Sequence, residues 1–478
     1  MKTYPNTSLY RECLLMIDQI DELFRNKEKT VVLGELDLEL VRLSSNLALA
    51  LEEEEIDQMD FKLFSLDKDL TKLIQLSNLA YHKKQLTLEE NEKMEGLLNG
   101  FLQKIRTFPQ RRKNILILSS IMGQGHMSAS KAIREGVEYL YGKDYHVDII
   151  DFYEQVGALL NKATVKAYEE STKHIPGAYK YIFEGTDAKW PVQLLNIVNY
   201  PLNAAKLEKL FKSYNPDIII SAYPIWDMLA TMIIKKCGPI KFFSIVTDSI
   251  SIHNAWVTGK PQAHIVANVE TAISLKKLGV PEHEIKILGF PVKLAFSTPG
   301  NRQEFLKDLG LNPELYTVVL LPTAQKTSAT IKIVNEIHNS YQDLNLLIIC
   351  GRNKELYPKM EAFNHEKNTR VIGWTDQMPE FIKNADLVIT KAGGSTVMEC
   401  IAAKKPMIIT QVIPGQEMGN AELIKLHELG IIQKDAKMSI AECVEYIRKN
   451  QPRILQNLAK ISNPDASLKI ARFIHSEL

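Results

Sequence analysis

A glycine-rich turn followed by a histidine stands between an apolar run and a helical pattern. Residues 119–129 read Ser-Ser-Ile-Met-Gly-Gln-Gly-His-Met-Ser-Ala, with glycines at Gly123 and Gly125 and the histidine at His126. The glycines let the backbone turn tightly and approach a ligand, and the start of the following helix favours negative charge. Imidazole titrates near neutrality, so His126 could act as a general base on an acceptor hydroxyl. A histidine that merely caps the helix is the alternative, because a single Gly-x-Gly is a weak motif.

A second glycine-rich turn has the composition of a phosphate site. After the apolar run that ends at Thr390, residues 391–399 read Lys-Ala-Gly-Gly-Ser-Thr-Val-Met-Glu. Such a turn presents backbone N–H groups and a helix dipole to a phosphate. Glu399, one turn inside the helix, could accept hydrogen bonds from sugar or ribose hydroxyls, whereas standing alone it would more simply be a surface carboxylate.

A third polar loop follows the next apolar run. It contains Gly415, Gln416 and Glu417, with Asn420 just beyond. Ligands of parallel sheets bind beyond the carboxyl ends of the strands. Two adjacent strands therefore direct these polar loops to one place.

The elements that must position these loops are short apolar runs that alternate with helical patterns from about residue 109. The first series comprises 114–120, 146–151, 217–221, 241–247, 265–268 and 285–289. After about residue 299 a second series comprises 317–322, 346–350, 370–373, 386–390 and 406–410. Strands that alternate with helices specify a parallel sheet covered on both faces. The sequence thus predicts an α/β fold with two successive doubly wound sheets.

The first 108 residues lack this alternation. Leu36, Leu40 and Leu43 recur at helical spacing, and Thr87 with Glu90 has the form of a capping box. We predict a helical extension at 1–108, Rossmann-like domains at 109–298 and 299–455, and a C-terminal helix at 456–478 that packs back on the first Rossmann-like domain.

Composition excludes several classes of protein. Lys and Arg total 58 against 57 Asp and Glu, so no global basic field is available and nucleic acid is not an expected partner. The five cysteines show no C-x-x-C spacing, which argues against a disulfide framework or a zinc site and fits a reducing cytosol. The longest apolar runs are strand-sized, and the chain starts without the apolar stretch of a signal peptide, so no bilayer-spanning segment is expected.

Several segments together carry a family resemblance. In the second half they are 373–378 (Gly-Trp-Thr-Asp-Gln-Met), 386–394 and 414–417 (Pro-Gly-Gln-Glu) with Asn420. In the first half they are 123–126, 216–219, 247–248 with His253 and Trp256, 289–292 and 350–353. From about residue 114 onward the chain resembles the monogalactosyldiacylglycerol synthase and processive diacylglycerol glucosyltransferase family. That family is related to the N-acetylglucosaminyltransferase of the lipid-linked peptidoglycan precursor.

The resemblance implies a GT-B fold, in which two Rossmann-like domains face each other. It implies a UDP-hexose donor held mainly by the second domain, an acceptor held by the first, and inversion at the anomeric carbon. His126 would be the base or lie beside it, and Asp248 would be a second acidic candidate. Neither a metal nor another cofactor is expected, since helix N-termini can stabilise the diphosphate. The donor-binding candidates are Gly123, Gly125, Lys326, Arg352, Gly373, Trp374, Gly393, Gly394, Ser395, Thr396, Glu399, Gly415, Gln416, Glu417 and Asn420.

One loop departs from the family pattern. The family usually has a glycine-rich loop after the first strand of the donor domain, where residues 321–330 read Leu-Pro-Thr-Ala-Gln-Lys-Thr-Ser-Ala-Thr. Without glycine the backbone should stand farther from the diphosphate, and the ammonium of Lys326 could fill the gap. Alternatively, Lys326 is solvated and the loop lies outside the site.

The acceptor region is expected at about 151–214, where aromatic and basic residues interleave. Tyr179, Lys180, Tyr181 and Trp190 suit an anionic lipid surface, although a packed helical insert would have the same composition. We predict a cytoplasmic enzyme, peripheral to the inner face of the membrane, that transfers glucose or galactose from a UDP-sugar to diacylglycerol or a related lipid hydroxyl. A polyprenyl-lipid or soluble acceptor, a sugar-nucleotide epimerase and a non-catalytic scaffold of the same fold are the alternatives.

Overall fold

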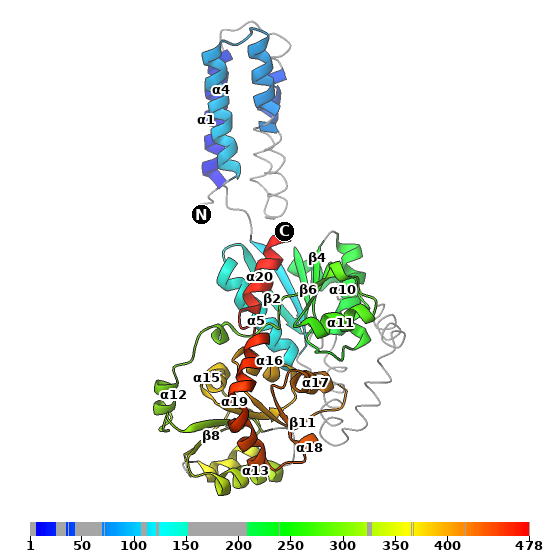
Figure 1. Cartoon of the computed structure of the whole chain (residues 1–478). Coiled ribbons are helices and arrows are strands. Elements are labelled where there is room, and N and C mark those ends of the chain that lie inside the picture. Colours follow the sequence, from blue (N-terminus) through cyan, green and yellow to red (C-terminus); the bar gives the residue numbers. More distant parts are fainter. Residues whose placement is uncertain are drawn as a thin grey trace. The chain divides into compact units, whose positions relative to one another are not determined.

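The chain divides into two compact units, Met1–Arg112 and Lys113–Leu478 (Figure 1). The computed structural model describes residues 6–24, 35, 36, 38–43, 69, 70, 72–106, 112–120, 124–151, 208–238, 240–322, 327–364, 366, 368–415 and 417–477.

The first unit is helical, as its leucine spacing predicts. Its described elements include α1 (Asn6–Phe24), α4 (Leu88–Arg106) and helical residues at 38–43 and 72–82. Leu36, Leu40 and Leu43 are buried in one apolar cluster. The predicted capping box is present, because the N–H of Glu90 donates to Thr87 Oγ1 over 3.2 Å and the N–H of Thr87 donates to Glu90 Oε2 over 2.7 Å. Residues 44–68 lie outside the described part of the chain.

The second unit contains two six-stranded sheets, and both are parallel throughout. The first has the order β2-β1-β3-β4-β5-β6. Its strands are β1 (Lys113–Ser119), β2 (Tyr145–Asp151), β3 (Ile218–Ser221), β4 (Lys241–Ile245), β5 (Ala263–Val266) and β6 (Ile285–Ile287). Helices α5 (Gln124–Tyr141) and α20 (Ala466–Ser476) share one core with this sheet. Helix α10 (Pro224–Cys237) shares a second core on the opposite face.

The second sheet has the order β12-β11-β10-β7-β8-β9. Its strands are β7 (Tyr316–Leu320), β8 (Leu344–Ile349), β9 (Thr369–Ile372), β10 (Leu387–Lys391), β11 (Met407–Gln411) and β12 (Gly430–Ile432). The helices of this half are α12 (Arg302–Asp308), α13 (Thr327–Ser340), α14 (Leu356–Met360), α15 (Met378–Asn384), α16 (Gly394–Ala402), α17 (Met418–Leu426), α18 (Gln433–Ala436) and α19 (Ile440–Ile461). The predicted α/β class with two parallel sheets is confirmed.

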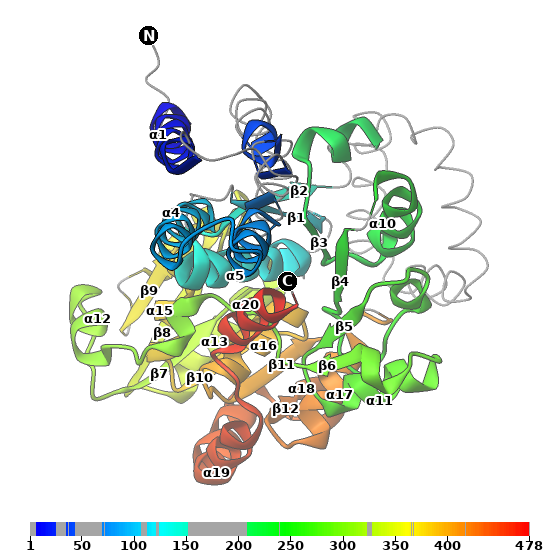
Figure 2. The same ribbon diagram turned by 90° about the horizontal axis from the view of Figure 1, so that it is seen from above.

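The C-terminal segment joins the two sheets. Helix α19 contributes Ile447 and Leu458 to the core of the second sheet, whereas Ile470 and Ile474 of α20 are buried in the core of the first. Figure 2 shows α20 beside α5, against which it packs. The chain passes from the second sheet to the first after Ile461. Residues 456–461 therefore continue α19, and the C-terminal helix begins later than the predicted residue 456.

No helix in the described ranges is long and apolar enough to cross a membrane.

Candidate active site

His126 lies in the first turn of α5, and its side chain is buried. Its Nδ1 is 2.9 Å from the carbonyl oxygen of Ala222 and 2.9 Å from Thr247 Oγ1. A carbonyl oxygen can only accept, so Nδ1 carries the hydrogen and Nε2 keeps its lone pair. The segments that follow β3 and β4 therefore hold the ring. Its hydrogen lies on Nδ1, which is the tautomer that a general base acting through Nε2 requires.

The surroundings of His126 keep its imidazole neutral. Burial lowers the pKa of His126 to about 4, and the hydrogen bond to Ala222 opposes this shift. The ring of Tyr223 meets the imidazole edge-on with 5.1 Å between ring centroids, and Trp256 lies 6.4 Å away. A histidine neutral at pH 7 is able to accept a proton.

Asp248 lies in the loop after β4, next to Thr247. The indole N–H of Trp256 donates to Asp248 Oδ2 over 2.7 Å. Burial raises the pKa of Asp248 to about 6, while the hydrogen bonds from Trp256 and the His253 backbone act in the opposite direction. Trp256 is itself fully buried and lies near both candidate catalytic side chains.

The partners of His126 were not identified as site residues from the sequence. Ala222 contributes only a carbonyl group, so its side chain offers no signal. Thr247 stands beside Asp248 in the family segment, which is the one available hint. Both approach His126 because β3 lies between β1 and β4 in the sheet, so that three successive loops meet at its carboxyl edge.

The second glycine-rich turn meets the first. Helix α16 begins at Gly394, directly after the strand β10 and a short turn. A Cβ placed on Gly125 would lie 3.3 Å from Ser395 Oγ, and one placed on Gly394 would lie 3.7 Å from the carbonyl oxygen of Thr247. The carboxyl-end loops of the two sheets thus approach each other closely; a side chain would be tight at Gly125 and in ordinary contact at Gly394.

Ser395 and Asn420 are two polar side chains of this region with unused hydrogen-bonding atoms. Ser395 Oγ and Asn420 Oδ1 are buried and have no partner among the described residues. The amide nitrogen of Asn420 donates to the carbonyl oxygen of Ala392 over 2.9 Å, which fixes the orientation of the side chain. Both atoms stand close to the start of α16, where Thr396 also lies in the first turn.

Glu417 is engaged within its own domain. Its Oε1 is 2.5 Å from Lys391 Nζ, and its Oε2 accepts the N–H of Ile413 over 2.9 Å. Both carboxylate oxygens are therefore occupied by the chain. Glu417 braces the loop between β11 and α17, including the positive-φ turn at Gly415.

Glu399 is a half-buried acid within α16. Burial raises the pKa of Glu399 to about 7, and the nearby positive charge of Lys293 opposes this shift. When protonated, its carboxyl can donate as well as accept hydrogen bonds.

The remaining candidates lie toward the other edge of the second sheet. Arg352 follows β8 and its guanidinium lies over the ring of Trp374, 5.1 Å from the centroid. Trp374 follows β9 beside Gly373, and 58% of its side chain is exposed. Strand β7 separates these loops from α16, so the structure divides the donor candidates into two groups. Gly123, Lys326, Gln416, Tyr179, Lys180, Tyr181 and Trp190 lie outside the described residues.

Two family descriptions match successive stretches of the chain. Residues 126–292 match monogalactosyldiacylglycerol (MGDG) synthase, and residues 322–476 match the glycosyltransferase family 28 C-terminal domain. Monogalactosyldiacylglycerol synthase 3, chloroplastic, of Arabidopsis thaliana is 28% identical over 383 residues, covering 77% of this chain and 82% of the relative. The chloroplastic synthase of Spinacia oleracea is 28% identical over 392 residues, covering 78% and 75%. The chain is a glycosyltransferase of the monogalactosyldiacylglycerol synthase and glycosyltransferase family 28 type.

A solved structure agrees with the fold expected of this glycosyltransferase. The structure of Medicago truncatula UGT71G1 complexed with UDP-glucose matches with a TM-score of 0.50 and 11% identity, covering 76% of this chain and 98% of that one. At this identity the likeness concerns the fold alone. With the two parallel sheets and their facing loops, it confirms the GT-B fold.

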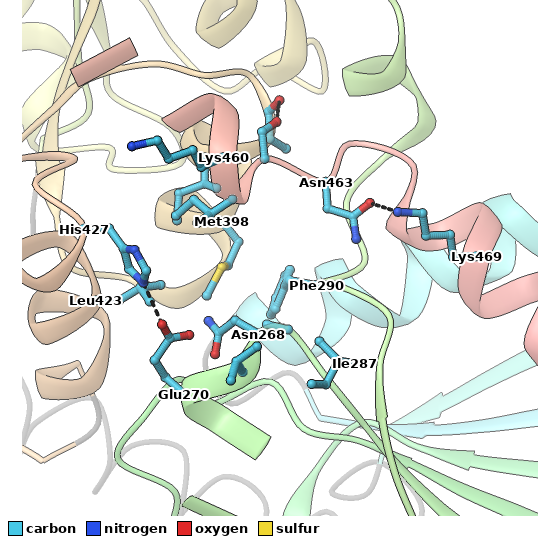
Figure 3. Close-up of a pocket in the computed structure, with 17 residues that line it drawn as sticks. Asn268, Glu270, Ile287, Phe290, Met398, Leu423, His427, Lys460, Asn463 and Lys469 are labelled. Carbon is cyan, nitrogen blue, oxygen red and sulfur yellow. Dashed lines mark hydrogen bonds and ion pairs between the residues drawn. The ribbon is translucent and has the colours of Figure 1, made fainter. Parts of the chain in front are cut away.

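A separate pocket of about 420 Å³ lies between the two sheets of the glycosyltransferase (Figure 3). An ion pair crosses it, with 2.8 Å between Glu270 Oε1 at the start of α11 (Val269–Lys277) and His427 Nε2 after α17. Phe290 and Met398 form part of its apolar wall. Among the described residues, none of those predicted from the sequence as site residues lines this pocket. The lining of the pocket includes Asn463, which lies between α19 and α20, where the chain passes from the second sheet to the first. The pocket is thus part of the connection between the domains.

Proposed function

We propose that this glycosyltransferase moves glucose or galactose from a UDP-sugar to the hydroxyl of diacylglycerol or a related membrane lipid, with inversion. The observation that carries the proposal is a neutral His126 at the place where the glycine-rich turns of the two sheets meet. The names of the relatives, which are monogalactosyldiacylglycerol synthases, support a lipid acceptor.

In the proposed reaction His126 Nε2 takes the proton of the acceptor hydroxyl. The hydroxyl oxygen attacks the anomeric carbon while the bond from that carbon to the diphosphate oxygen breaks, and UDP leaves with the electron pair. Backbone N–H groups at the start of α16 and the helix dipole stabilise the negative charge that develops on UDP.

Donor binding should also raise the basicity of His126. In the structure, burial without a counter-charge holds the pKa of this imidazole at about 4. A diphosphate beside the turn that Gly125 shares with Ser395 adds negative charge, which favours the imidazolium ion. Asp248, when ionised, acts in the same direction. The base would thus reach its working strength only with the donor in place.

The remaining donor contacts follow from the two groups of residues. We assign the diphosphate and sugar to the turn at 393–396 with Glu399 and Asn420, and the uracil to the exposed edge formed by Gly373 and Trp374. Glu417 contributes by bracing its loop. We further propose peripheral attachment to the membrane through the stretch 151–214, and transfer without a metal ion.

The decisive experiment uses the purified full chain with radiolabelled UDP-glucose and UDP-galactose, and liposomes with or without diacylglycerol. The expected result is a labelled lipid, UDP release that depends on diacylglycerol, and no loss of activity in EDTA. NMR of the product should show the configuration opposite to that of the donor. Failure of every lipid acceptor to support UDP release would refute the lipid-transfer proposal. Transfer of the label to polyprenyl phosphate but not to diacylglycerol would reassign the acceptor to a polyprenyl lipid.

A further inference from the structure

Asp227 is a fully buried acid that the proposed chemistry does not use. It lies in the first turn of α10 and none of its surface is exposed. Its Oδ2 accepts the hydroxyl of Ser244 over 2.7 Å, and its Oδ1 has no partner among the described residues. A buried carboxyl with so few donors requires an explanation.

Asp227 covers a row of polar side chains on one face of the first sheet. Ser221 of β3 pairs in register with Ser244 of β4, and Ser244 pairs with His264 of β5. Neighbours in register point to the same side of a parallel sheet, here the side covered by α10. His264 is buried, its Nε2 donates to the carbonyl oxygen of Trp256 over 3.2 Å, and its Nδ1 has no described partner.

This polar row supports the segments that surround His126. The hydroxyl of Ser221 donates to the carbonyl oxygen of Tyr223 over 3.0 Å, and the residue between them is Ala222, which accepts the hydrogen of His126. Ser244 belongs to the strand that leads to Thr247, the second partner of His126. The carbonyl oxygen and the indole of Trp256 link His264 to Asp248.

Only the neutral form of Asp227 suits this place. Since the hydroxyl hydrogen of Ser221 points to Tyr223, Ser221 can accept from a protonated carboxyl but cannot also donate to a carboxylate. Burial raises the pKa of Asp227 to about 8, and the hydrogen bond that Ser244 donates opposes this shift.

Charged groups on the neighbouring elements do not offset the burial of Asp227. His264 of β5 is itself buried, and burial lowers its pKa to about 4, so it is neutral at pH 7. The lysines of α10 lie in its last turn, Lys241 begins β4 at the opposite end from Ser244, and Lys260 approaches α10 through its backbone N–H. Among the described residues, none of these contributes a charge that holds Asp227 ionised.

We propose that Asp227 is a positioning residue for the transfer reaction, acting as a neutral acid that fixes the ends of β3 and β4 against His126. This inference rests on the proposed role of His126 as the base. It assigns the acid no contact with either substrate. Ionisation of Asp227 should loosen the Ala222 and Thr247 contacts and so reduce turnover.

The test compares the wild type, Asp227→Asn and Asp227→Ala over pH 6.5 to 9.5. Wild-type kcat should fall as the pH rises through about 8, whereas the Asn variant, whose amide is neutral at every pH, should keep its kcat. The Ala variant should lose about 100-fold in kcat, the scale of a misplaced catalytic group, with the KM for the donor little changed. Glu138→Gln, an exposed change on α5, serves as the control and should retain the wild-type profile.

Thermal unfolding provides a readout that does not depend on the transfer reaction. The pKa of Asp227 is raised in the fold from an ordinary value of 3.8, so its protonation stabilises the fold at low pH and that contribution is lost as the pH rises toward 8. The Tm of the wild type should therefore fall between pH 5 and 8.5 relative to that of Asp227→Asn. The positioning role would be overturned if the kcat of the Asn variant fell at alkaline pH as much as that of the wild type, or if a folded Ala variant kept the wild-type kcat. Tm profiles of the wild type and Asp227→Asn that run parallel with pH would overturn the neutral state of Asp227. Absence of transfer in every protein, the wild type included, would count against the proposed function instead.

Discussion

Replacing Gly419 by alanine should separate sugar transfer from donor binding. Gly419 lies in the first turn of α17, on the donor side, and packs against the loop that follows β4. A Cβ at this position would overlap the carbonyl oxygen of Ser249 and lie 2.8 Å from the backbone nitrogen of Ser251. Both atoms belong to backbone, so no side-chain rotation can relieve the collision.

The loop opposite Gly419 cannot yield easily. Ile250 has a φ of 52°, a left-handed conformation that is strained for a β-branched residue and costs about 1–3 kcal/mol. The same loop carries Asp248 and the Thr247 contact to His126. Overpacking by one methyl group costs about 1–3 kcal/mol, and each 1.4 kcal/mol corresponds to a tenfold change. If the cost falls on the contact between the two Rossmann-like domains, kcat/KM should drop by about 5- to 150-fold.

The assay measures transfer kinetics beside calorimetric titration of UDP. The contacts proposed for UDP lie in the second domain, so its affinity should change less than kcat/KM. Met418→Ala, one residue earlier and half exposed, is the matched control and should be nearly neutral. Ile250→Gly should partly rescue the Gly419→Ala variant, because glycine tolerates the left-handed region and lets the loop shift. A kcat/KM within twofold of the wild-type value in a folded Gly419→Ala protein would refute the argument that this contact between the domains is needed for transfer.

Three further predictions concern single side chains. His126→Ala should lower kcat by about 10²- to 10⁴-fold with little change in UDP affinity, and near-normal turnover in the folded variant would move the base role to Asp248. Trp256→Phe removes a hydrogen bond that lowers the pKa of Asp248, so any acidic limb of the pH–rate profile that Asp248 produces should move to higher pH; an unmoved limb would exclude Asp248 as its source. Lys326→Ala should weaken UDP binding by about 1.5–3 kcal/mol in calorimetry if its ammonium meets the diphosphate, and unchanged affinity would show that the loop lies outside the site.

Local patterns predicted the fold class and every described strand except β12. Apolar runs of strand length that alternate with helical periods predicted both sheets, because burial on both faces requires that composition in every strand of a parallel sheet. The Thr87–Glu90 capping box was likewise predictable, since it joins residues three apart. Gly125, His126 and Gly394 could be selected because a glycine turn before a helix is a local device for binding anions. Glu399 and Asn420 were selected from the polar loops that follow two adjacent strands, and family resemblance added Asp248 as a candidate.

Tertiary structure decided how these residues are partnered and charged. The sequence predicts Glu417 as a donor contact, whereas in the structure its two oxygens interact with Lys391 and the backbone of Ile413. The contact of His126 with Ala222 and Thr247, and the row beneath Asp227, depend on strand order and register, which join residues far apart in the chain. A pKa depends on burial and on neighbours in space, so the lowered pKa of His126 and the raised pKa of Asp227 arise only once the sheet has assembled. Residue types and their local spacing were thus readable from the sequence, whereas solvent exclusion and long-range contacts, which control protonation, belong to the folded protein.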